Sequence, residues 1–277
     1  MKEAADTAPQ PPADPAAPVL AFRGVSIAFD GRAVLEQIDF SVAPGETRIL
    51  LGPAGVGKSV LLKLANGLLR PDEGSIRLFG REISRLPEEW LFPMRMRVGM
   101  VFQEGALFDS LSVRENVAYQ LIQEGVADDE IDRRVLDALR FVELENTFSL
   151  FPASLSGGMR RRVAIARALI RQPELLLYDS PTGGLDPVTS TTIIELIVKE
   201  RDVYKTPSLL VTHRLQDAFT LCTHRFDSAL NRMVPLPKGE TNPQTTFLML
   251  NEGRMIFDGA LHELLRSQDP FVREFLE

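Results

Sequence analysis

The chain has 277 residues, of which 44% are hydrophobic and 25% are charged, as in an ordinary globular protein with a sizeable core. Its net charge of −7, without a dominant basic patch, disfavours nucleic acid as a partner, and its one cysteine, Cys222, excludes an internal disulfide. No apolar run approaches the ~20 residues of a membrane-spanning helix and the acidic, proline-rich start does not predict a signal peptide, so we expect at most a peripheral membrane subunit.

The first elements of the chain predict a leader followed by a hairpin. Residues 1–17 are rich in alanine and proline without an apolar period, which predicts a disordered leader before one domain over residues 18–277. Two strand-like runs then follow, Leu20–Phe29 and Ala33–Val42. A hairpin of these strands would bring Phe29 close to the glycine-rich loop that comes next. Its ring could stack on an adenine base, or it could be a core phenylalanine.

The next segment, Gly52–Ser59, fits the pattern G-x-x-x-x-G-K-[ST] and is called the glycine loop below. A short buried strand is predicted before it and a helix after it, and this context builds an anion site from inward-pointing N–H groups and a helix N-terminus. Lys58 would reach the β- and γ-phosphates, and the Ser59 hydroxyl would be a ligand of Mg²⁺. The predicted nucleoside-triphosphate site comprises Gly52, Pro53, Ala54, Gly55, Val56, Gly57, Lys58, Ser59 and Val60.

Beyond this loop, strands are predicted over Ser75–Phe79 and Met94–Val101. The second strand ends close to Gln103, and a glutamine at a strand end can complete Mg²⁺ coordination and sense the γ-phosphate. From Val113 the pattern becomes helical, with a second helix beginning near Asp128. We therefore predict an inserted helical lobe over about residues 104–170.

A second candidate anion site lies at Ser156-Gly157-Gly158, before a strongly periodic helix. The arginine run Arg160–Arg162 follows it. The place of this run at the head of an amphipathic helix favours a structural, phosphate-facing or solvated role over nucleic-acid binding.

The last part of the chain predicts two more buried strands, each followed by a polar residue. Leu175–Asp179 ends in a carboxylate, the arrangement that holds Mg²⁺ beside a phosphate loop, and Ser208–Thr212 ends in His213. Between them lie a loop with Asp186 and a helix. The polar stretch over residues 231–246 contains three prolines and predicts a loop insertion. A closing hairpin, Phe247–Leu250 with Met255–Phe257, and a helix over Ala260–Ser267 complete the expected fold.

Taken in order from Val19 onward, these features resemble the ATP-binding subunit of ABC transporters. The matching segments are Gly52–Ser59 (Walker A), Gln103 (Q-loop), Leu155–Met159 (signature), Leu175–Asp179 (Walker B), Gly184–Asp186 (D-loop) and His213 (H-loop). The resemblance implies an α/β P-loop NTPase fold, with a RecA-like core, an antiparallel β subdomain and an inserted α-helical subdomain. It also implies an ATPase with ATP and Mg²⁺ as cofactors. Its implied catalytic residues are Lys58, Gln103, Asp179, Ser180 and His213; its implied metal ligands are Ser59, Gln103 and Asp179; and Phe29, Ser156, Gly157, Gly158 and Asp186 would contact nucleotide.

Two short segments, Gln103–Leu111 and Ser156–Arg160, look like those of the Mla/Mce lipid-transport ATPases. In many importer subunits a glutamine stands at the position of Met159. The lipid branch energises a permease that moves phospholipids or related lipids between the membranes of double-membraned cells. An amino-acid-type importer subunit is the alternative.

This branch implies a peripheral subunit on the cytoplasmic face of the inner membrane. Two copies would clasp two ATP molecules head to tail, each between Lys58 of one copy and Ser156–Gly158 of the other. The implied partners are an integral-membrane, MlaE-like permease and a Mce-domain substrate-binding protein. The stretch Ile83–Met94, with the helical lobe, would form the groove for the permease's coupling helix.

The chain departs from the family at Ser180, where a glutamate usually follows the Walker B aspartate. A hydroxyl is a poor base at neutral pH, so Ser180 can position water but hardly accept its proton. Three interpretations are open. The sites hydrolyse slowly, with help from His213 and the substrate; they bind ATP and cycle only in the assembled transporter; or the residue was altered deliberately to trap ATP.

Overall fold

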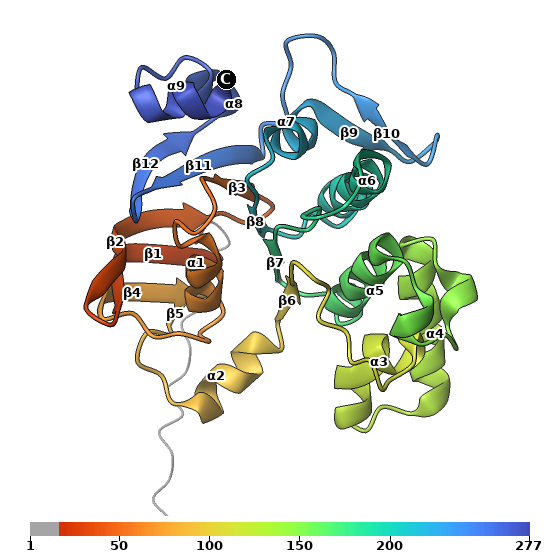
Figure 1. The fold of residues 1–277 in the computed structure, drawn as a ribbon. Helices are drawn as coiled ribbons and strands as arrows, with labels where there is room; N and C mark the ends of the chain where they lie inside the picture. The colour runs from red at the N-terminus through yellow and green to blue at the C-terminus, as the bar shows by residue number, and fades with distance from the viewer. Residues whose placement is uncertain (1–16) are drawn as a thin grey trace, which may run out of the picture.

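The computed structural model describes residues 17–277, so the predicted leader lies outside the described residues except for Ala17. A six-stranded sheet of order β12-β11-β3-β8-β7-β6 forms the centre of the fold (Figure 1). All neighbouring strands in it are parallel except the β11–β12 hairpin. Its strands are β3 (Thr47–Leu51), β6 (Val98–Val101), β7 (Leu175–Asp179), β8 (Ser208–Val211), β11 (Thr245–Asn251) and β12 (Arg254–Gly259).

The parallel strands of this central sheet are largely buried on both faces, which explains why they read as continuous apolar runs, whereas the edge strand β12 is half-exposed. Successive side chains of a strand point to opposite faces. In β3, Ile49 and Leu51 accordingly join a core shared with helices, whereas Leu50 joins a second core shared with the antiparallel sheet. The two cores thus sandwich the strands whose ends carry the candidate site.

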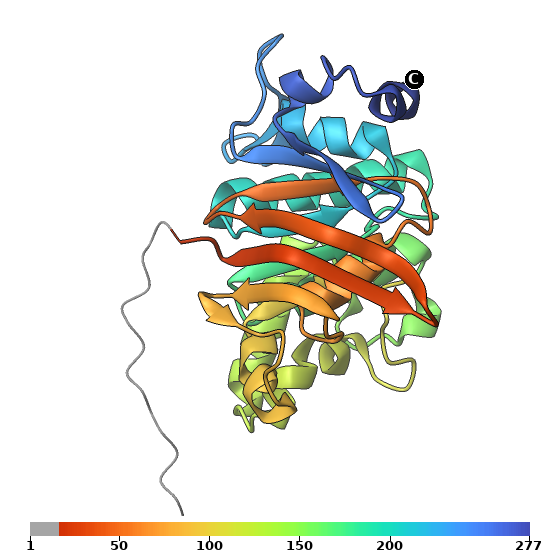
Figure 2. The ribbon, with the colours of Figure 1, turned by 90° about the vertical axis from the view of Figure 1, so that its left-hand side faces the viewer.

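The second sheet is antiparallel, has the order β2-β1-β4-β5 and is seen face-on in Figure 2. Phe22 and Phe40 stack across its first hairpin with ring centroids 4.7 Å apart. The predicted hairpin and the predicted α/β class with an added antiparallel sheet are confirmed. The strands are β1 (Leu20–Phe29), β2 (Arg32–Val42), β4 (Glu73–Leu78) and β5 (Arg81–Glu82).

The helices fall into groups around the central sheet. In Figure 1, α1 lies beside the antiparallel sheet, whereas α3, α4 and α5 form a group on the other side of β6 and β7. The division of the chain into subdomains stays a prediction. The helices are α1 (Lys58–Ala65), α2 (Glu88–Arg95), α3 (Val113–Gln123), α4 (Asp128–Phe141), α5 (Gly157–Leu169), α6 (Pro187–Tyr204), α7 (Leu215–Thr223), α8 (Leu261–Leu264) and α9 (Pro270–Leu276), with short 3-10 turns at Glu145–Thr147 and Pro152–Ser154.

The predicted strand over Met94–Val101 is wrong in its first half, because Met94 belongs to α2 and β6 begins only at Val98. Two glutamates in the first turn of α2 favour a helix N-terminus, and Leu91 and Met94 are buried at a spacing of three residues. The segment predicted to meet a permease is therefore largely a helix.

Two further predictions near the C-terminus need correction. Within the predicted loop over residues 231–246, β10 (Arg232–Pro235) pairs with β9 (His224–Asp227), and β11 already begins at Thr245. The predicted last helix shrinks to the single turn of α8, and α9 follows it. The side chain of Asp269 caps α9 by accepting hydrogen bonds from the backbone N–H groups of Phe271 (2.9 Å) and Val272 (3.1 Å).

Candidate nucleotide-binding site

The glycine loop connects β3 to α1, as the sequence predicts. Gly52 has a φ of 150° and Gly57 a φ of 105°, conformations that side chains rarely adopt. A Cβ on Gly52 would lie 2.4 Å from the carbonyl oxygen of Leu250, and one on Gly57 would lie 2.9 Å from a methyl of Leu35. Glycine is therefore required at both positions by conformation and by space.

Lys58 is the first residue of α1, and its side chain turns back over the loop. Its Nζ donates hydrogen bonds to the carbonyl oxygens of Gly52 (2.8 Å) and Pro53 (2.6 Å). Burial lowers the pKa of Lys58, and the negative charge of Asp179 raises it. A Cβ on Gly55 would meet no atom within 4 Å, so the loop is open at this point. A buried ammonium group, an open curled backbone and a helix N-terminus together fit a polyphosphate.

The remaining predicted residues of this segment lie close to the loop. Ser59, on the first turn of α1, is exposed, and Val60 is half-buried. The first hairpin packs against the loop, because the space beyond Gly57 is filled by Val34 and Leu35 of β2. Phe29, at the end of β1 in the same hairpin, is 43% exposed, as a ring available for stacking must be.

The carboxyl ends of neighbouring parallel strands gather the other predicted residues. Asp179 ends β7 and is paired with Val211, the last residue of β8, and His213 follows two residues later. Gln103 follows β6, the neighbour of β7 on its other side. An added Cβ on Gly183 would lie 3.5 Å from the side chain of Gln103, so the loops after β6 and β7 are in contact.

Ser180 lies in a tight turn directly after Asp179. Its φ is +46°, a left-handed conformation, and its side chain is buried. Its N–H donates to the carbonyl oxygen of Val211 (2.9 Å), and its own carbonyl oxygen accepts from the N–H of Gly183 (2.9 Å). The backbone thus holds Ser180 firmly at the position where the family usually has a glutamate.

Arg214, next to His213, ties two loops together. Its guanidinium donates to the carbonyl oxygen of Thr182 (3.2 Å) and the hydroxyl of Ser190 (3.0 Å), and it forms an ion pair with Asp217 (3.4 Å). The Thr182 hydroxyl also donates to Asp217. The residue after the predicted H-loop histidine therefore fixes the loop that leads to Asp186.

The arginines of α5 hold the loop that carries Gln103. Arg161 donates to the carbonyl oxygens of Phe102 (3.1 Å) and Gly183 (3.3 Å). Arg167 donates to those of Gly105 and Ala106, both at 2.7 Å. Burial lowers the pKa of both guanidinium groups. Their role is structural, one of the roles that the sequence favours for the arginine run.

The two helices near the predicted signature and D-loop begin with side-chain caps. Ser156 caps α5 by accepting from the N–H of Met159 (3.2 Å), and Asp186 caps α6 by accepting from the N–H of Thr189 (3.0 Å). The hydrogen bonds from Thr189 lower the pKa of Asp186. A Cβ on Gly158 would lie 2.3 Å from the Thr189 methyl, so Gly158 allows the two helix ends to approach each other. Gly157 precedes it in α5.

Sequence reasoning missed several residues that position this site. Arg161, Arg167, Arg214 and Asp217 act through backbone carbonyls and a neighbouring hydroxyl, and such contacts leave no residue pattern. The only available signals were that the arginines of α5 recur on an otherwise apolar helix and that Arg214 is adjacent to His213.

Residues 17–277 contain no group of three or more His, Cys, Asp or Glu side chains that could hold a metal ion. A magnesium ion here would therefore need phosphate oxygens and water besides Ser59, Gln103 and Asp179. No helix in this part of the chain is both long enough and apolar enough to span a membrane.

Comparison with known proteins places these features in one family. The family model for ABC transporters matches residues 35–183. The chain is 36% identical to TRIGALACTOSYLDIACYLGLYCEROL 3 of Arabidopsis thaliana, over 91% of this chain and 72% of that protein. It is 32% identical to the intermembrane phospholipid transport ATP-binding protein MlaF of Haemophilus influenzae, over 89% of this chain and 85% of MlaF.

An importer subunit and a solved cassette are similarly related. The methionine import ATP-binding protein MetN 2 of Bacillus cereus is 35% identical over 93% of this chain and 72% of that protein. The dimeric post-hydrolysis structure of the ATP-binding cassette MJ0796 with ADP and Pi superposes with a TM-score of 0.73, covering 87% of this chain and 98% of that one at 27% identity. With its glycine loop, its strand-end carboxylate and these similarities, the chain belongs to the ABC transporter family, as an ATP-binding cassette ATPase that is similar to MlaF and TRIGALACTOSYLDIACYLGLYCEROL 3 as well as to importer subunits.

Proposed function

We propose that this chain is the ATP-hydrolysing subunit of a transporter that moves phospholipid or a related lipid between membranes. The observation that carries the proposal is its similarity to MlaF, whose name describes intermembrane phospholipid transport, together with the Met159-containing signature segment that resembles that branch. The chain would lie on the cytoplasmic face of the inner membrane as a peripheral subunit.

The glycine loop would hold the triphosphate of ATP. Lys58 Nζ would exchange its carbonyl acceptors, Gly52 and Pro53, for β- and γ-phosphate oxygens, which are stronger, charged acceptors. Phe29 would stack on adenine. The fit of the triphosphate to this loop is supported by the open space at Gly55 and by the buried ammonium group of Lys58.

Mg²⁺ would neutralise charge on the β- and γ-phosphates, held by Ser59, Gln103 and, through water, Asp179. The side chain of Gln103 lies close to Gly183 in the loop after β7, so a change at the γ-phosphate that moves Gln103 would also move this loop. His213, at the end of the neighbouring strand β8, would contact the same phosphate and help to orient the attacking water.

We propose that hydrolysis is slow because Ser180 lacks the carboxylate that accepts the proton of water. General-base assistance is typically worth ~10²–10⁴ in rate, whereas charge stabilisation by Lys58, Mg²⁺ and the signature amides does not depend on this residue. A second function, a nucleotide-gated subunit with negligible hydrolysis, is favoured by the same substitution. Turnover measured with the permease present distinguishes the two.

We propose two copies as the working unit, with each ATP between Lys58 of one copy and Ser156–Gly158 of the other. In one copy, α1 and α5 lie on opposite sides of β6 and β7, so the two halves of a site come from different elements of the fold (Figure 1). The dimeric form of the solved cassette supports this arrangement. Asp186, the N-cap residue of α6, would lie at the interface between the two copies.

The permease would dock on α2 and the loop before α3. Trp90 and Phe92 of α2 are 44% and 59% exposed, and Phe108 packs against Tyr119 with ring centroids 4.8 Å apart while both rings remain exposed. Exposed aromatic rings are typical of the centre of an interface. The side chain of the fully buried Asn116 accepts from the N–H of Phe108 (2.8 Å) and donates to its carbonyl oxygen (3.0 Å), so this loop is preformed.

The test is affinity capture of the full chain from native membranes, with mass spectrometry of the proteins and lipids retained. We expect an MlaE-like multi-span permease, a Mce-domain protein and bound phospholipid. Replacing Phe92 with Asp should release the permease, whereas Leu265→Asp, which changes an exposed leucine outside the proposed docking surface, should retain it. Recovery of an amino-acid permease instead would reject the lipid assignment in favour of the importer that MetN 2 exemplifies.

A further inference from the structure

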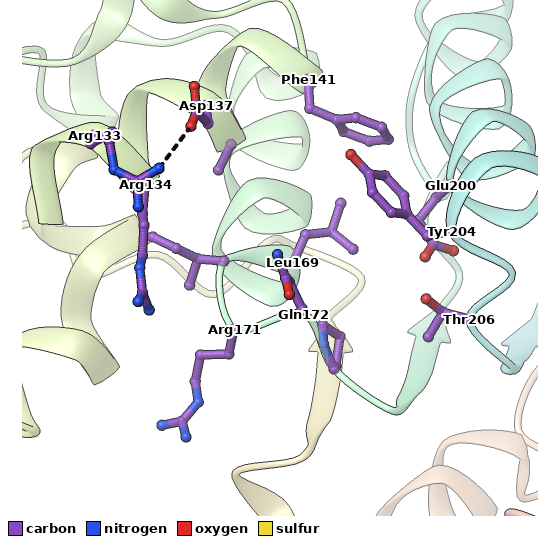
Figure 3. A pocket seen from close by; sticks show the side chains of 13 residues that line it. Arg133, Arg134, Asp137, Phe141, Leu169, Arg171, Gln172, Glu200, Tyr204 and Thr206 are labelled. Atoms are coloured by element: carbon purple, nitrogen blue, oxygen red, sulfur yellow. Dashed lines mark ion pairs between the residues drawn. The ribbon is translucent and has the colours of Figure 1, made fainter. Parts of the chain in front are cut away.

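A cavity of about 640 Å³ opens between α4, the end of α5 and the end of α6 (Figure 3). Its lining includes Arg134, Phe141, Arg171, Glu200 and Tyr204. It also includes Pro173, two residues before β7, at the amino end of a strand whose carboxyl end carries Asp179. Because five strand residues span about 15 Å, this cavity is separate from the ATP site.

The deep wall of the cavity holds a carboxyl group whose hydrogen bonding is incomplete. Glu200 is only 2% exposed, and its Oε1 has no hydrogen-bond partner within residues 17–277. The Thr206 hydroxyl, which also lines the cavity, is the one group that lowers its pKa, and burial raises that pKa to about 7. A buried carboxyl oxygen without a partner costs stability, so a missing donor is the natural explanation of this arrangement.

The other walls of the cavity are aromatic and cationic. Phe141 and Tyr204 face each other with ring centroids 5.7 Å apart. Arg133, Arg134 and Arg171 line the side of the cavity that lies across from Glu200 and Tyr204 (Figure 3). The acids Glu130, Asp137 and Glu124 pair with these arginines. Since each guanidinium carries five N–H donors, it can bind a further anion while it keeps its acidic partner.

We propose that this cavity binds a small zwitterion, with its ammonium group on Glu200 and its phosphate or carboxylate group on the arginines that line it. A cation alone would meet the positive arginines, and an anion alone would leave the deep carboxyl without a donor. A ligand with both charged groups and a short apolar spacer would place its ammonium group on the carboxyl group, its anion on the arginines and its spacer beside the aromatic rings. The same chemistry occurs in free amino acids, in aminoalkyl phosphates and in the ethanolamine headgroup of lipids.

Binding there would link the helical group of α4 and α5 to α6, which begins directly after Asp186. The ligand would therefore hold together elements that carry the predicted signature and D-loop. This gives the site a regulatory role that does not depend on which substrate the transporter moves.

The experiment is isothermal titration of the full chain with phosphoethanolamine and, as the analogue without an ammonium group, ethyl phosphate. We expect phosphoethanolamine to bind at least ten-fold more tightly at pH 8. The variant Glu200→Gln should lose this preference, whereas Glu274→Gln, at an exposed position on α9, should keep it. Thermal unfolding of both variants checks that they are folded.

Because the ammonium group needs an ionised Glu200, affinity should also fall by about ten-fold between pH 8 and pH 6. The other charged side chains that line the cavity are those of Arg133, Arg134, Asp137 and Arg171. The Glu200→Gln variant should therefore show no comparable change, apart from the second ionisation of phosphate. The carboxylate zwitterion γ-aminobutyrate, which has no such ionisation, provides that correction.

Vesicles that contain phosphatidylethanolamine separate the two sources of the headgroup chemistry. Sedimentation with these vesicles but not with phosphatidylcholine vesicles, lost in Glu200→Gln, would assign the site to a lipid headgroup. Binding of the soluble zwitterions without sedimentation would assign it to a free metabolite. Equal affinity of wild type and Glu200→Gln for every probe, or no binding of any probe at millimolar concentration, would overturn the proposal.

Discussion

Ser180 is positioned by its backbone rather than by its side chain. The hydrogen bond from the Ser180 N–H to the carbonyl oxygen of Val211 and the turn closed by the N–H of Gly183 do not depend on which side chain stands at residue 180. The left-handed φ of +46° costs a glutamate about as much as it costs a serine. A carboxylate introduced at this position would therefore start from the correct backbone.

We expect Ser180→Glu to raise the rate of ATP hydrolysis by roughly ten-fold or more, because it supplies the missing general base. ATP affinity should change little, since the triphosphate contacts of the glycine loop are unaltered. The measurement is single-turnover hydrolysis at saturating Mg-ATP in the assembled transporter. Ser180→Gln, which adds similar bulk without a base, is the matched control. If the Ser180→Glu variant hydrolyses ATP no faster than wild type, the site has another base or needs none.

Glu200 makes stability depend on pH in a direction opposite to that of most carboxylates. Burial raises its pKa from 4.5 to about 7, so the folded chain binds this proton more tightly than the unfolded chain. The favourable contribution of Glu200 to the free energy of unfolding is complete below pH 4.5 and is lost as the pH rises through 7. This contribution amounts to at most about 3 kcal/mol.

Urea unfolding of wild type and Glu200→Gln at pH 5 and pH 8, without added zwitterion, measures this effect. We expect the stability of the variant, relative to wild type, to increase between pH 5 and pH 8. Carboxylates with lowered pKa, such as Glu115 in its capping box, are present in both chains and cancel in the difference. A difference in stability that is the same at both pH values would contradict the raised pKa.

At the scale of elements, α5 connects the predicted signature to the loop that carries Gln103. Its first turn is capped by Ser156, and Arg161 and Arg167 hold carbonyl groups on both sides of Gln103. A movement of α5 that follows nucleotide binding must therefore move Gln103, the proposed γ-phosphate sensor, in the same copy. This connection is built from fork-shaped guanidinium groups, which a lysine cannot reproduce.

We expect Arg167→Lys to lower the rate of ATP hydrolysis by roughly ten-fold while ATP affinity changes little, because the glycine loop is untouched and only the position of Gln103 is relaxed. Steady-state kinetics separates the two quantities as kcat and KM. Arg140→Lys, on the exposed side of α4, is the control and should behave as wild type. An equal loss in both variants, or a loss confined to KM, would argue against the connection.

The sequence predicts most of the elements because their signals are local. Strands buried on both faces read as apolar runs, and the glycine loop, the Ser156 cap and the Asp179 strand end are short patterns. The prediction of a strand before Val98 was wrong because the apolar Met94 belongs to the buried face of a helix and not to a strand. The β9–β10 hairpin was missed because its strands are short and mostly half-exposed, polar and apolar residues are mixed in them, and a proline stands at the end.

The sequence predicts the residues of the candidate site but not the residues that hold them in place. Lys58 opens α1, Asp179 ends β7 and His213 follows β8, so each is marked by a recognisable element. Arg214 and Asp217 act on the loop before Asp186 only because the fold brings α7 beside it. Contacts from a side chain to a distant carbonyl are set by three-dimensional packing, which no local pattern encodes. The cavity at Glu200 could not be predicted from the sequence for the same reason, since nothing in the sequence of α6 distinguishes it from other helices.

At the scale of the whole molecule, the proposed dimer gives each chain two half-sites. We expect the chain to be monomeric without nucleotide and to dimerise with Mg-ATP, because in this proposed arrangement each ATP needs Ser156–Gly158 of a partner. Light scattering of the Ser180→Gln variant, in which hydrolysis is suppressed further, measures the mass directly. Ser156→Arg places bulk and charge at an exposed helix cap and should prevent dimerisation. Dimerisation that persists in Ser156→Arg, or no nucleotide-dependent change of mass in any variant, would count against the head-to-tail arrangement.

The most direct test of the central claim is ATP-dependent transfer of a fluorescent phospholipid between vesicles by the transporter purified through this chain. We predict transfer by wild type and by Lys63→Ala, which changes an exposed lysine of α1, and at least a ten-fold loss in Lys58→Ala, which removes the phosphate-facing charge. Transfer that is unaffected by Lys58→Ala, or ATP turnover that drives methionine uptake without lipid movement, would contradict the account.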